Sequence, residues 1–210
     1  MAGKFITIEG QDGAGKSTNI EVISSRLAHA GIKYQVTREP GGTNLGEALR
    51  ALLLQDKDNL IGDMAELLLM FAARAQHLKE VIEPVLESGE WVVCDRFTDA
   101  SYAYQGGGRN MDSSAIATLE TLVQGQLRPD LTVLLDLPVE ISAERADARS
   151  APDRFEVQAQ QFKQRVRATY LELAKNDPNR VQVVDASQTL VQVNQAVSDL
   201  IDSFIAREDG

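Results

Sequence analysis

A glycine-rich segment near the start of the chain carries the clearest chemical signal in the sequence. It reads Gly10-Gln11-Asp12-Gly13-Ala14-Gly15-Lys16-Ser17, with Thr18 after it. Glycines let the backbone curl so that successive N–H groups point at phosphate oxygens, and the helix that starts there adds positive potential. In such a loop the lysine, here Lys16, reaches the β- and γ-phosphates, and the hydroxyl of Ser17 can bind Mg²⁺. We therefore predict that this segment, the P-loop, binds ATP.

The surroundings of the P-loop suit this chemistry but do not identify a reaction. The apolar segment 5–8 precedes it as a predicted strand, and a helical pattern begins at Lys16. GTPases, ATPases and small-molecule kinases all carry a P-loop. A GTPase usually reads its base with an Asn-Lys-x-Asp segment, which the sequence lacks, and a motor ATPase would need more chain for coupling. Kinases and ATP-binding switches remain.

Two arginines that follow other predicted strands could bind a second phosphate. Arg38 ends one such strand, and Arg96 follows Asp95 at the end of another. Ligands bind beyond the carboxyl ends of strands in open α/β sheets, and guanidinium forks bind phosphate with geometric specificity. The alternative for each arginine is a salt bridge at a strand end. Asp95 could contact Mg²⁺ through water, or it could be a structural partner of Arg96.

The elements that position these residues alternate along the chain. Short, continuous runs of Val, Ile and Leu indicate buried parallel strands. We predict strands at Lys4–Glu9, Tyr34–Arg38, Trp91–Asp95, Leu131–Asp136 and Val181–Val184. We predict helices at 16 to about 30, 45–54, 63–88, 112–125, about 139–149, 156–175 and 190–207, and a helical piece after the third strand that breaks at 106–108. Pro84 should kink or stop the third of these helices.

This order of elements predicts an α/β fold. We expect a three-layer P-loop NTPase fold, with a five-stranded parallel sheet flanked by helices and a short lid. Residues 1–210 should form a single P-loop kinase domain. His29 and His77 lie on helical stretches, and we expect both at the surface.

Composition sets a condition on any nucleotide site. The 210 residues carry a formal net charge of −10, which argues against a nucleic acid or an anionic membrane as partner. Nucleotide binding therefore requires arginines clustered locally. Cys94 is the only cysteine, and its apolar neighbours predict a buried structural thiol. With no signal-peptide pattern and no apolar run near ~18 residues, we predict a cytoplasmic protein with no membrane partner.

Together these segments resemble those of bacterial thymidylate kinases. The resemblance rests on the P-loop and on four further motifs: Arg-Glu-Pro-Gly-Gly at 38–42, Phe-Ala-Ala-Arg at 71–74, Asp-Arg-Phe at 95–97 and Tyr-Gln-Gly-Gly-Gly-Arg at 104–109. It extends over nearly the whole chain. It implies an enzyme that transfers a phosphoryl group from ATP to dTMP, giving ADP and dTDP for dTTP synthesis, with Mg²⁺ and as a homodimer.

The resemblance also implies contacts to dTMP. Asp12 would contact the 3′-hydroxyl and help to place the phosphate that Arg38 and Arg96 bind. Arg74 would donate a hydrogen bond to a thymine carbonyl. Ser101 and Gln105 would lie at the base. The loop 185–188 would support the adenine of ATP.

Two aromatic positions follow from the same resemblance. Tyr104 would lie under the deoxyribose and exclude a 2′-hydroxyl. Many relatives carry the aromatic residue that stacks on the base four positions before the arginine, where this chain has Met70. Met70 or Phe71 could cover the thymine, since both lie about one turn from Arg74. We favour Phe71.

A short arginine-rich segment, about 145–156, is the predicted lid. Arg145 and Arg149 share one face of a predicted helix, and Arg154 follows. The family places an extra arginine in the P-loop or in the lid, and Gly13 makes this chain resemble the lid-arginine type. We predict that Arg145 contacts ATP and that Arg149 and Arg154 stabilise charge on the transferring group. A solvated helix face is the alternative, because acidic residues are interleaved.

The predicted mechanism depends on positioning and charge. A phosphate monoester has a second pKa near ~6, so at pH 7 its oxygen is already a nucleophile and needs no general base. The predicted catalytic residues are Lys16, Arg38, Arg96, Arg149 and Arg154, with Ser17 and Asp95 at Mg²⁺. Two rival functions stay open: a P-loop kinase of another nucleotide or nucleoside, and a non-catalytic ATP-binding switch.

Overall fold

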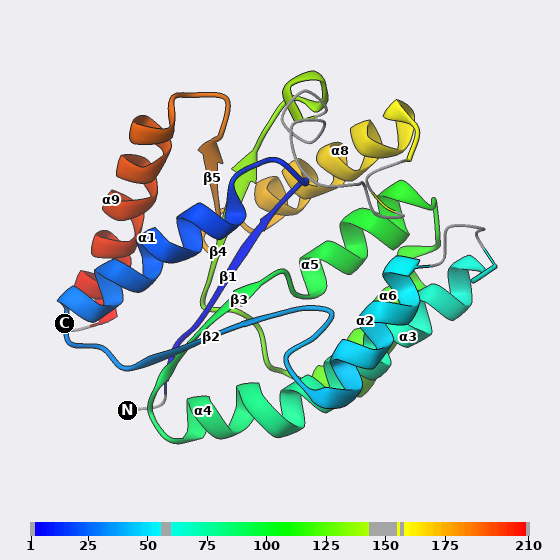
Figure 1. Ribbon diagram of the computed structural model, residues 1–210, viewed down its shortest axis with the longest axis horizontal. Helices are drawn as coiled ribbons and strands as arrows, with labels where there is room; N and C mark the ends of the chain where they lie inside the picture. The colour runs from blue at the N-terminus through cyan, green and yellow to red at the C-terminus, as the bar shows by residue number, and fades with distance from the viewer. Residues whose placement is uncertain (1–2, 56–59, 143–154, 156–157, 209–210) are drawn as a thin grey trace.

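The computed structural model describes residues 3–55, 60–142, 155 and 158–208 (Figure 1). Five parallel strands form one sheet in the order β2-β3-β1-β4-β5. Their bounds are Phe5–Gly10 (β1), Tyr34–Arg38 (β2), Trp91–Asp95 (β3), Leu131–Asp136 (β4) and Val181–Asp185 (β5). The predicted five-stranded parallel sheet is confirmed. Three strands have the predicted bounds, and β1 and β5 each end one residue later than expected.

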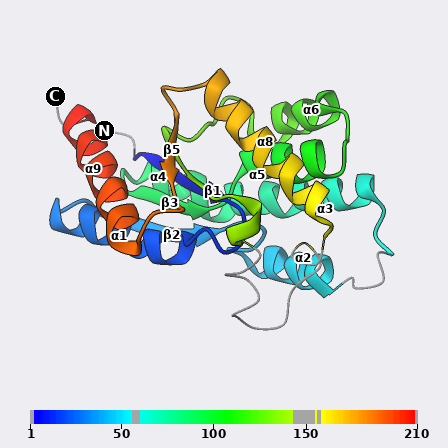
Figure 2. The ribbon, with the colours of Figure 1, turned by 90° about the horizontal axis from the view of Figure 1, so that it is seen from above.

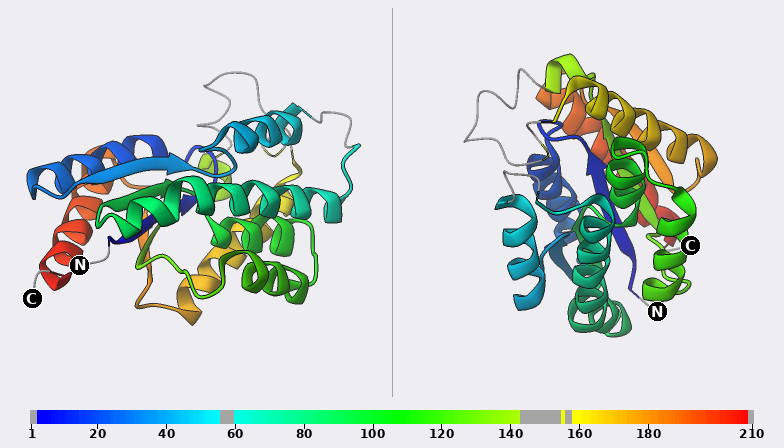
Figure 3. Two further views of the ribbon diagram at one scale, coloured as in Figure 1. Left: turned by 90° about the horizontal axis from the view of Figure 1, so that it is seen from below. Right: turned by 90° about the vertical axis from the view of Figure 1, so that its right-hand side faces the viewer.

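Helices cover both faces of the sheet, as predicted for a three-layer fold. α1 and α9 pack together on one face, and α8, α5 and the α3–α4 region lie on the other (Figure 2). The helices are α1 (Lys16–His29), α2 (Asn44–Gln55), α3 (Asp63–His77), α4 (Glu83–Glu87), α5 (Thr98–Ser101), α6 (Ser113–Gln124), α8 (Gln160–Asn176) and α9 (Leu190–Glu208). α2 packs against α3 beside this sandwich (Figure 3).

The central strand β1 holds the core together because both of its faces are buried. All six of its residues are buried. Ile6 and Ile8 face α1 and α9, where they join a cluster that includes Leu27 and Ile201. Phe5 faces the other way and its ring meets the Phe97 ring edge-on at 4.9 Å. The carboxyl end of β1, where the P-loop starts, is thus anchored from both sides.

The predicted helix 63–88 changes its hydrogen-bonding pattern before Pro84. α3 ends at His77, a π-helical segment η1 spans Leu78–Ile82, and α4 follows. Pro84 lies in the first turn of α4, directly after the helical residues of η1, and it has no N–H to donate to a carbonyl of the preceding turn. The hydrogen-bonding pattern thus changes just before Pro84, but the chain stays helical to Glu87.

The predicted helical piece ends at the last of the three glycines 106–108. Its final part is a π-helix, η2, over Tyr102–Gly108, so the helix includes the glycines before it breaks. A Cβ on Gly107 would lie 2.1 Å from Thr169 Oγ1, and one on Gly108 would lie 2.5 Å from the Phe162 ring. The glycines thus let α8 approach η2 closely, and Arg165 of α8 donates hydrogen bonds to both glycine carbonyls.

Parts of two predicted elements lie outside the described residues. The predicted helix 139–149 is described as helical only over 139–142, and Arg145, Arg149 and Arg154 of the predicted lid lie outside the described part of the chain. The predicted helix 156–175 begins at Gln160. Across the residues that the structure describes, no helix is both long and apolar enough to span a membrane.

Candidate functional site

The P-loop joins β1 to α1 through a run of left-handed glycines. Gly13 and Gly15 have φ angles of 82° and 92°, a region that side chains with a Cβ seldom adopt. Gly15 is also the residue before the first turn of α1, which begins at Lys16. Lys16 folds back over the loop, and its Nζ donates to the carbonyls of Gly10 and Gln11 at 3.2 Å each. The lysine is thereby placed on the concave side of the loop.

A cavity of about 210 Å³ opens beside the P-loop. It brings together most residues predicted to bind the two phosphates and the acceptor. Those in its wall are Asp12, Gly13, Gly15, Lys16, Ser17, Arg38, Arg74, Asp95, Arg96, Ser101, Tyr104 and Gln105. Gly10, Gln11, Ala14 and Thr18 of the P-loop segment, and Phe71, are not in this wall.

Arg96 is held in a strained backbone conformation at the cavity. Its φ angle is 69°, which is rare for a residue other than glycine. Its N–H donates to Ile8 O at 3.0 Å, and its carbonyl accepts from Cys94 Sγ at 3.1 Å. The next N–H, of Phe97, donates to Glu9 Oε1 at 2.7 Å. Cys94 is fully buried, as predicted, and it helps to fix this turn.

The charges at the P-loop are paired with one another. Arg96 Nη2 donates to Asp12 Oδ1 at 2.6 Å, and Lys16 Nζ lies 3.7 Å from the same oxygen. Burial acts to raise the pKa of Asp12, but the charges of Arg96 and Lys16 outweigh it and hold that pKa below its ordinary value. Burial and the neighbouring Arg96 lower the pKa of Lys16. The partner of Arg96 is therefore Asp12, where the sequence had suggested Asp95.

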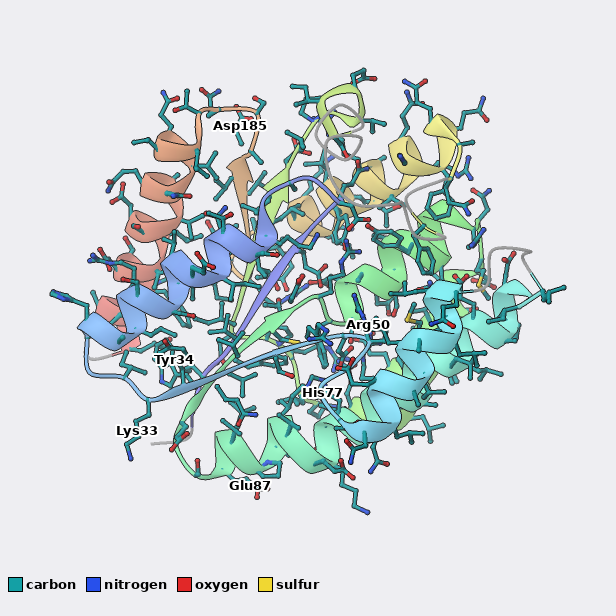
Figure 4. The ribbon with its side chains drawn as sticks, viewed as in Figure 1. Lys33, Tyr34, Arg50, His77, Glu87 and Asp185 are labelled. Atoms are coloured by element: carbon teal, nitrogen blue, oxygen red, sulfur yellow. The ribbon has the colours of Figure 1, made fainter. Side chains whose placement is uncertain are left out.

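A second ion pair joins the end of β2 to α2. Arg38 Nη2 donates to both carboxylate oxygens of Glu47, at 2.8 and 2.7 Å, and both side chains are about half exposed. Arg50, which sequence reasoning missed, also lines the cavity and donates to Pro40 O at 3.0 Å. Figure 4 shows Arg50 beside the end of β2. Arg50 lies about one helical turn after Glu47 on α2, and this spacing could have marked it as a neighbour of the site.

Arg74 of α3 is buried, and three hydrogen bonds hold its guanidinium. Its Nε donates to Glu39 Oε2 at 2.7 Å, and its Nη2 donates to Phe97 O and Ser101 Oγ at 3.1 Å each. Among the described residues its Nη1 has no hydrogen-bond partner. Arg74 also lines the cavity, so Nη1 is a candidate donor to a ligand there.

The side chains next to Arg74 correct the expectation about the aromatic cover. Phe71 is 2 % exposed and packs with Leu67 and Ile116, and its ring lies 4.5 Å from Arg74 Cζ. Met70, and not Phe71, lines the cavity. Rotation by one residue on α3 turns a side chain by about 100°, which moves Phe71 from the cavity into the core.

The expectation that His77 lies at the surface is wrong. His77 is fully buried, whereas His29 is exposed as predicted. His77 Nδ1 lies 3.0 Å from Glu39 Oε1, and its Nε2 lies 2.6 Å from Thr37 Oγ1. Glu39 therefore joins His77 to Arg74, and sequence reasoning missed both of these roles.

Gln105 and Tyr104 complete the wall from η2. Gln105 is buried, and its Nε2 donates to Glu66 Oε1 at 2.8 Å. A carboxylate only accepts hydrogen bonds, so this contact fixes which end of the amide faces Glu66. The Tyr104 ring lies 4.8 Å from Arg96 Cζ.

Glu9 lies beneath the site, fully buried at the end of β1. Besides the Phe97 N–H it accepts a hydrogen bond from Tyr170 Oη of α8 at 2.7 Å. Burial and the charge of Asp99 raise the pKa of Glu9 to about 8. Nothing in the sequence pattern marked this residue, since a glutamate before a P-loop also fits an exposed strand end.

Ser17 and Asp95 are the residues that could hold a metal ion. Both line the cavity, and Asp95 Oδ1 is buried without a hydrogen-bond partner among the described residues. No group of three His, Cys, Asp or Glu side chains suited to a metal occurs in the described ranges. This donor set fits Mg²⁺, which binds through one or two protein oxygens together with phosphates and water.

Asp185, which opens the loop predicted to support adenine, lies at the carboxyl end of β5 (Figure 4). Its carboxylate accepts hydrogen bonds from Ser187 N and Oγ, at 2.9 and 2.6 Å. It does not line the cavity beside the P-loop. The adenine contact stays a prediction.

Comparisons with known proteins agree with the geometry. The family model described as thymidylate kinase matches residues 8–197. The chain is 53% identical over 210 residues to a thymidylate kinase of Pseudomonas fluorescens, covering all of both chains. It is 52% identical over 204 residues to one of Methylococcus capsulatus, covering 97% of each. It superposes with a TM-score of 0.76 on the crystal structure of a thymidylate kinase from Ehrlichia chaffeensis, at 32% identity and covering 96% of this chain and 99% of that one.

Proposed function

We propose that the two ends of the cavity bind different parts of the substrates. The chain belongs to the thymidylate kinase family and transfers a phosphoryl group to dTMP. Its resemblance to bacterial thymidylate kinases, as a P-loop α/β enzyme, is confirmed by the comparisons. One end of the cavity, the phosphate end, consists of the P-loop with Arg96 and Arg38. The other, the base end, consists of Arg74, Ser101 and Gln105. The two rival functions are not favoured.

At the phosphate end, charge would replace water around the reacting groups. Lys16 would bind the β- and γ-phosphates of ATP, and Arg96 and Arg38 would hold the acceptor phosphate in line with it. Arg50, also in the cavity wall, would add a third guanidinium. Asp12 would exchange its contact with Arg96 for the 3′-hydroxyl of dTMP. Arg38 and Arg96 are already paired with carboxylates, so at these two arginines the incoming phosphate would take the place of an existing anion.

At the base end, one observation carries the choice of thymine. Arg74 Nη1 is a buried donor without a partner among the described residues, and Gln105 presents its carbonyl oxygen because its NH₂ faces Glu66. A donor and an acceptor together match a ring carbonyl beside an imino N–H, as thymine has. Cytosine carries an amino group and an unprotonated ring nitrogen at those positions. The donor of Arg74 would then face another donor, and the carbonyl oxygen of Gln105 would face another acceptor.

The sugar and the face of the base would be recognised by shape. Tyr104, buried and in the cavity wall, would lie under the deoxyribose and leave no room for a 2′-hydroxyl. Met70 would cover the thymine, because it lines the cavity where Phe71 does not.

Mg²⁺ would be held by Ser17, with Asp95 contacting it directly or through water. The unpartnered Oδ1 of Asp95 supports this assignment. The ion supplies positive charge that neutralises the phosphate oxygens during transfer.

Further parts of the proposal rest on the sequence. Its length, motifs and charge support a single domain over residues 1–210, the P-loop segment Gly10–Thr18 as the ATP site, a cytoplasmic location and the absence of a nucleic-acid or membrane partner. The family resemblance supports a homodimer. A lid at about 145–156 would bring Arg145, Arg149 and Arg154 to the ATP phosphates. Lowered kcat without a change in the KM for dTMP, in Arg149→Ala and Arg154→Ala, would support the lid assignment.

A panel of acceptors tests the base end. Purified protein with Mg-ATP should release ADP fastest with dTMP, measured by a coupled assay. dUMP lacks only the methyl contact, worth ~1–3 kcal/mol, so it should be slower but active. UMP should be slower still, and dCMP, dAMP and dGMP slowest. Replacing Tyr104 by a smaller residue should narrow the gap between dUMP and UMP.

Two outcomes would contradict parts of this assignment. If dCMP ran faster than dTMP, the donor and acceptor assigned to Arg74 and Gln105 would be wrong. If Tyr104→Ala left the ratio of dUMP to UMP unchanged, the sugar is read by another residue.

A further inference from the structure

We infer that His77 is a positioning residue for dTMP recognition, which acts through Glu39 on the guanidinium of Arg74. The inference rests on the proposed role of Arg74 in reading the base. His77 does not line the cavity and has no part in the proposed transfer, yet it is fully buried at the end of α3 (Figure 4). Burying an imidazole is costly unless its nitrogens find polar partners. Here both nitrogens have one.

The hydrogen bonds of His77 run in one direction. The carboxylate of Glu39 can only accept, so His77 Nδ1 carries the proton and donates to Glu39 Oε1 at 3.0 Å. In the neutral imidazole, Nε2 is then left to accept from the hydroxyl of Thr37 at 2.6 Å. The other oxygen of Glu39 accepts from Arg74 Nε at 2.7 Å. A continuous series of hydrogen bonds thus joins β2 and the loop after it to α3, through Thr37, His77, Glu39 and Arg74.

This series of hydrogen bonds fixes the plane of the Arg74 guanidinium. Glu39 holds Nε, while Phe97 O and Ser101 Oγ hold Nη2, so the guanidinium cannot rotate without breaking a buried hydrogen bond. Only Nη1 is left to meet the base. If Glu39 lost its contact with His77, its carboxylate could turn, and Arg74 would turn with it. The direction of Nη1, and with it the affinity for the thymine carbonyl, would change.

The imidazole is itself confined by the loop after β2. A Cβ on Gly42 would lie 2.5 Å from His77 Nε2, so the backbone of this loop packs directly on the ring. The same loop begins after Arg38 and includes Glu39. His77 therefore ties the segment that carries a phosphate-binding arginine to the helix that carries the base-reading arginine.

Two substitutions separate the two contacts of His77. His77→Asn keeps an N–H donor near the position of Nδ1, facing Glu39. His77→Gln instead places its amide near the position of Nε2, facing Thr37, and leaves Glu39 without this donor. We expect the KM for dTMP to rise about tenfold in His77→Gln and by no more than about threefold in His77→Asn, as for the loss or retention of one buried hydrogen bond. The KM for ATP should change less than twofold in both.

Calorimetric titration of dTMP without ATP provides a readout independent of turnover and should show the same order of affinities. His29→Gln, on the exposed histidine of α1, is the matched control and should bind dTMP as the unsubstituted protein does. Thr37→Val, which removes the hydroxyl that orients the imidazole, should weaken dTMP binding about two- to threefold. It keeps the inference testable if a His77 variant fails to fold.

Equal weakening by His77→Asn and His77→Gln would overturn the inference, as would a loss of thermal stability with dTMP binding intact. Normal dTMP binding by Thr37→Val would also count against it. Arg74→Ala separates this result from the proposed function. If Arg74→Ala leaves the KM for dTMP unchanged, Arg74 does not read the base and the proposed function is wrong there. If Arg74→Ala weakens dTMP binding and His77→Gln does not, only the role of His77 fails.

Discussion

The two ends of the cavity are built in opposite ways. The phosphate end is built on the P-loop segment, whose residues are adjacent in sequence, and adds Arg38 and Arg96 from the ends of two other strands. Both arginines are paired with carboxylates, which we propose the ligand displaces. The base end is made of buried side chains from distant segments, and its arginine is held by carboxylate and carbonyl groups that a ligand does not replace. Phosphate is strongly charged and can compete for an arginine. A neutral base cannot, so its site must be organised before it binds.

Turnover should depend most strongly on the phosphate end. Lys16→Ala removes the one ammonium on the concave side of the P-loop segment, where charge develops during transfer. We expect kcat to fall by roughly 10²-fold or more, as for the loss of one group that stabilises the transition state. Steady-state ADP release with saturating dTMP measures it. Arg26→Ala, which breaks a surface pair between α1 and Asp202 of α9, is the control. Near-normal turnover in a folded Lys16→Ala protein would remove the lysine from the mechanism.

How far each end could be predicted follows from the same difference. The P-loop and the strand bounds depend on residues adjacent in sequence, so the sequence predicted them well. The contacts of Glu39 with Arg74 and His77 join residues 35 and 38 positions apart. No local sequence pattern shows such a pair. A histidine on a helix also gives no sign in the sequence of whether it is buried, as His77 is, or exposed, as His29 is. The choice between Met70 and Phe71 depended on the rotation of α3, which packing against Leu67 and Ile116 decides.

The same change from glutamate to glutamine can be made at both ends of the cavity. Glu39→Gln and Glu47→Gln each neutralise a carboxylate that holds an arginine of the cavity. At the base end the loss of Glu39 should raise the KM for dTMP about tenfold, because Arg74 loses a buried charged partner. At the phosphate end the loss of Glu47 should leave the KM equal or lower it by about two- to threefold, because Arg38 no longer has to leave its half-exposed partner.

Initial rates over a range of dTMP concentrations, at fixed Mg-ATP, measure both variants. Effects of the same sign at the two ends would contradict the distinction between displaceable and permanent partners. A rise in KM for Glu47→Gln would mean that Glu47 positions Arg38 instead of competing with the phosphate.

The two ends meet at Phe97, and the buried Glu9 that holds its N–H should affect stability more than turnover. Its N–H is held by Glu9 beside Arg96, and its carbonyl accepts from Arg74. Burial raises the pKa of Glu9 to about 8, whereas in the unfolded chain it should be near the ordinary value of 4.5. Between these two values the unfolded chain releases a proton that the folded protein keeps. The free energy of unfolding should therefore fall as pH rises from about 4.5 to 8.

Glu9→Gln isolates this contribution because glutamine resembles the protonated acid. Its carbonyl can accept from the Phe97 N–H, and its NH₂ can donate to Tyr170 Oη. The free energy of unfolding of Glu9→Gln, relative to the unsubstituted protein, should rise by about 1 kcal/mol or more between pH 5.5 and 8.5. Urea titrations at the two pH values measure it, with Glu21→Gln on the exposed face of α1 as control. A difference that stays constant across this range would show that Glu9 is already ionised in the folded protein at pH 5.5. The turn at Arg96 and Phe97 would then rest on a buried negative charge, and the phosphate end would hold one more permanent anion than the comparison between the two ends assumes.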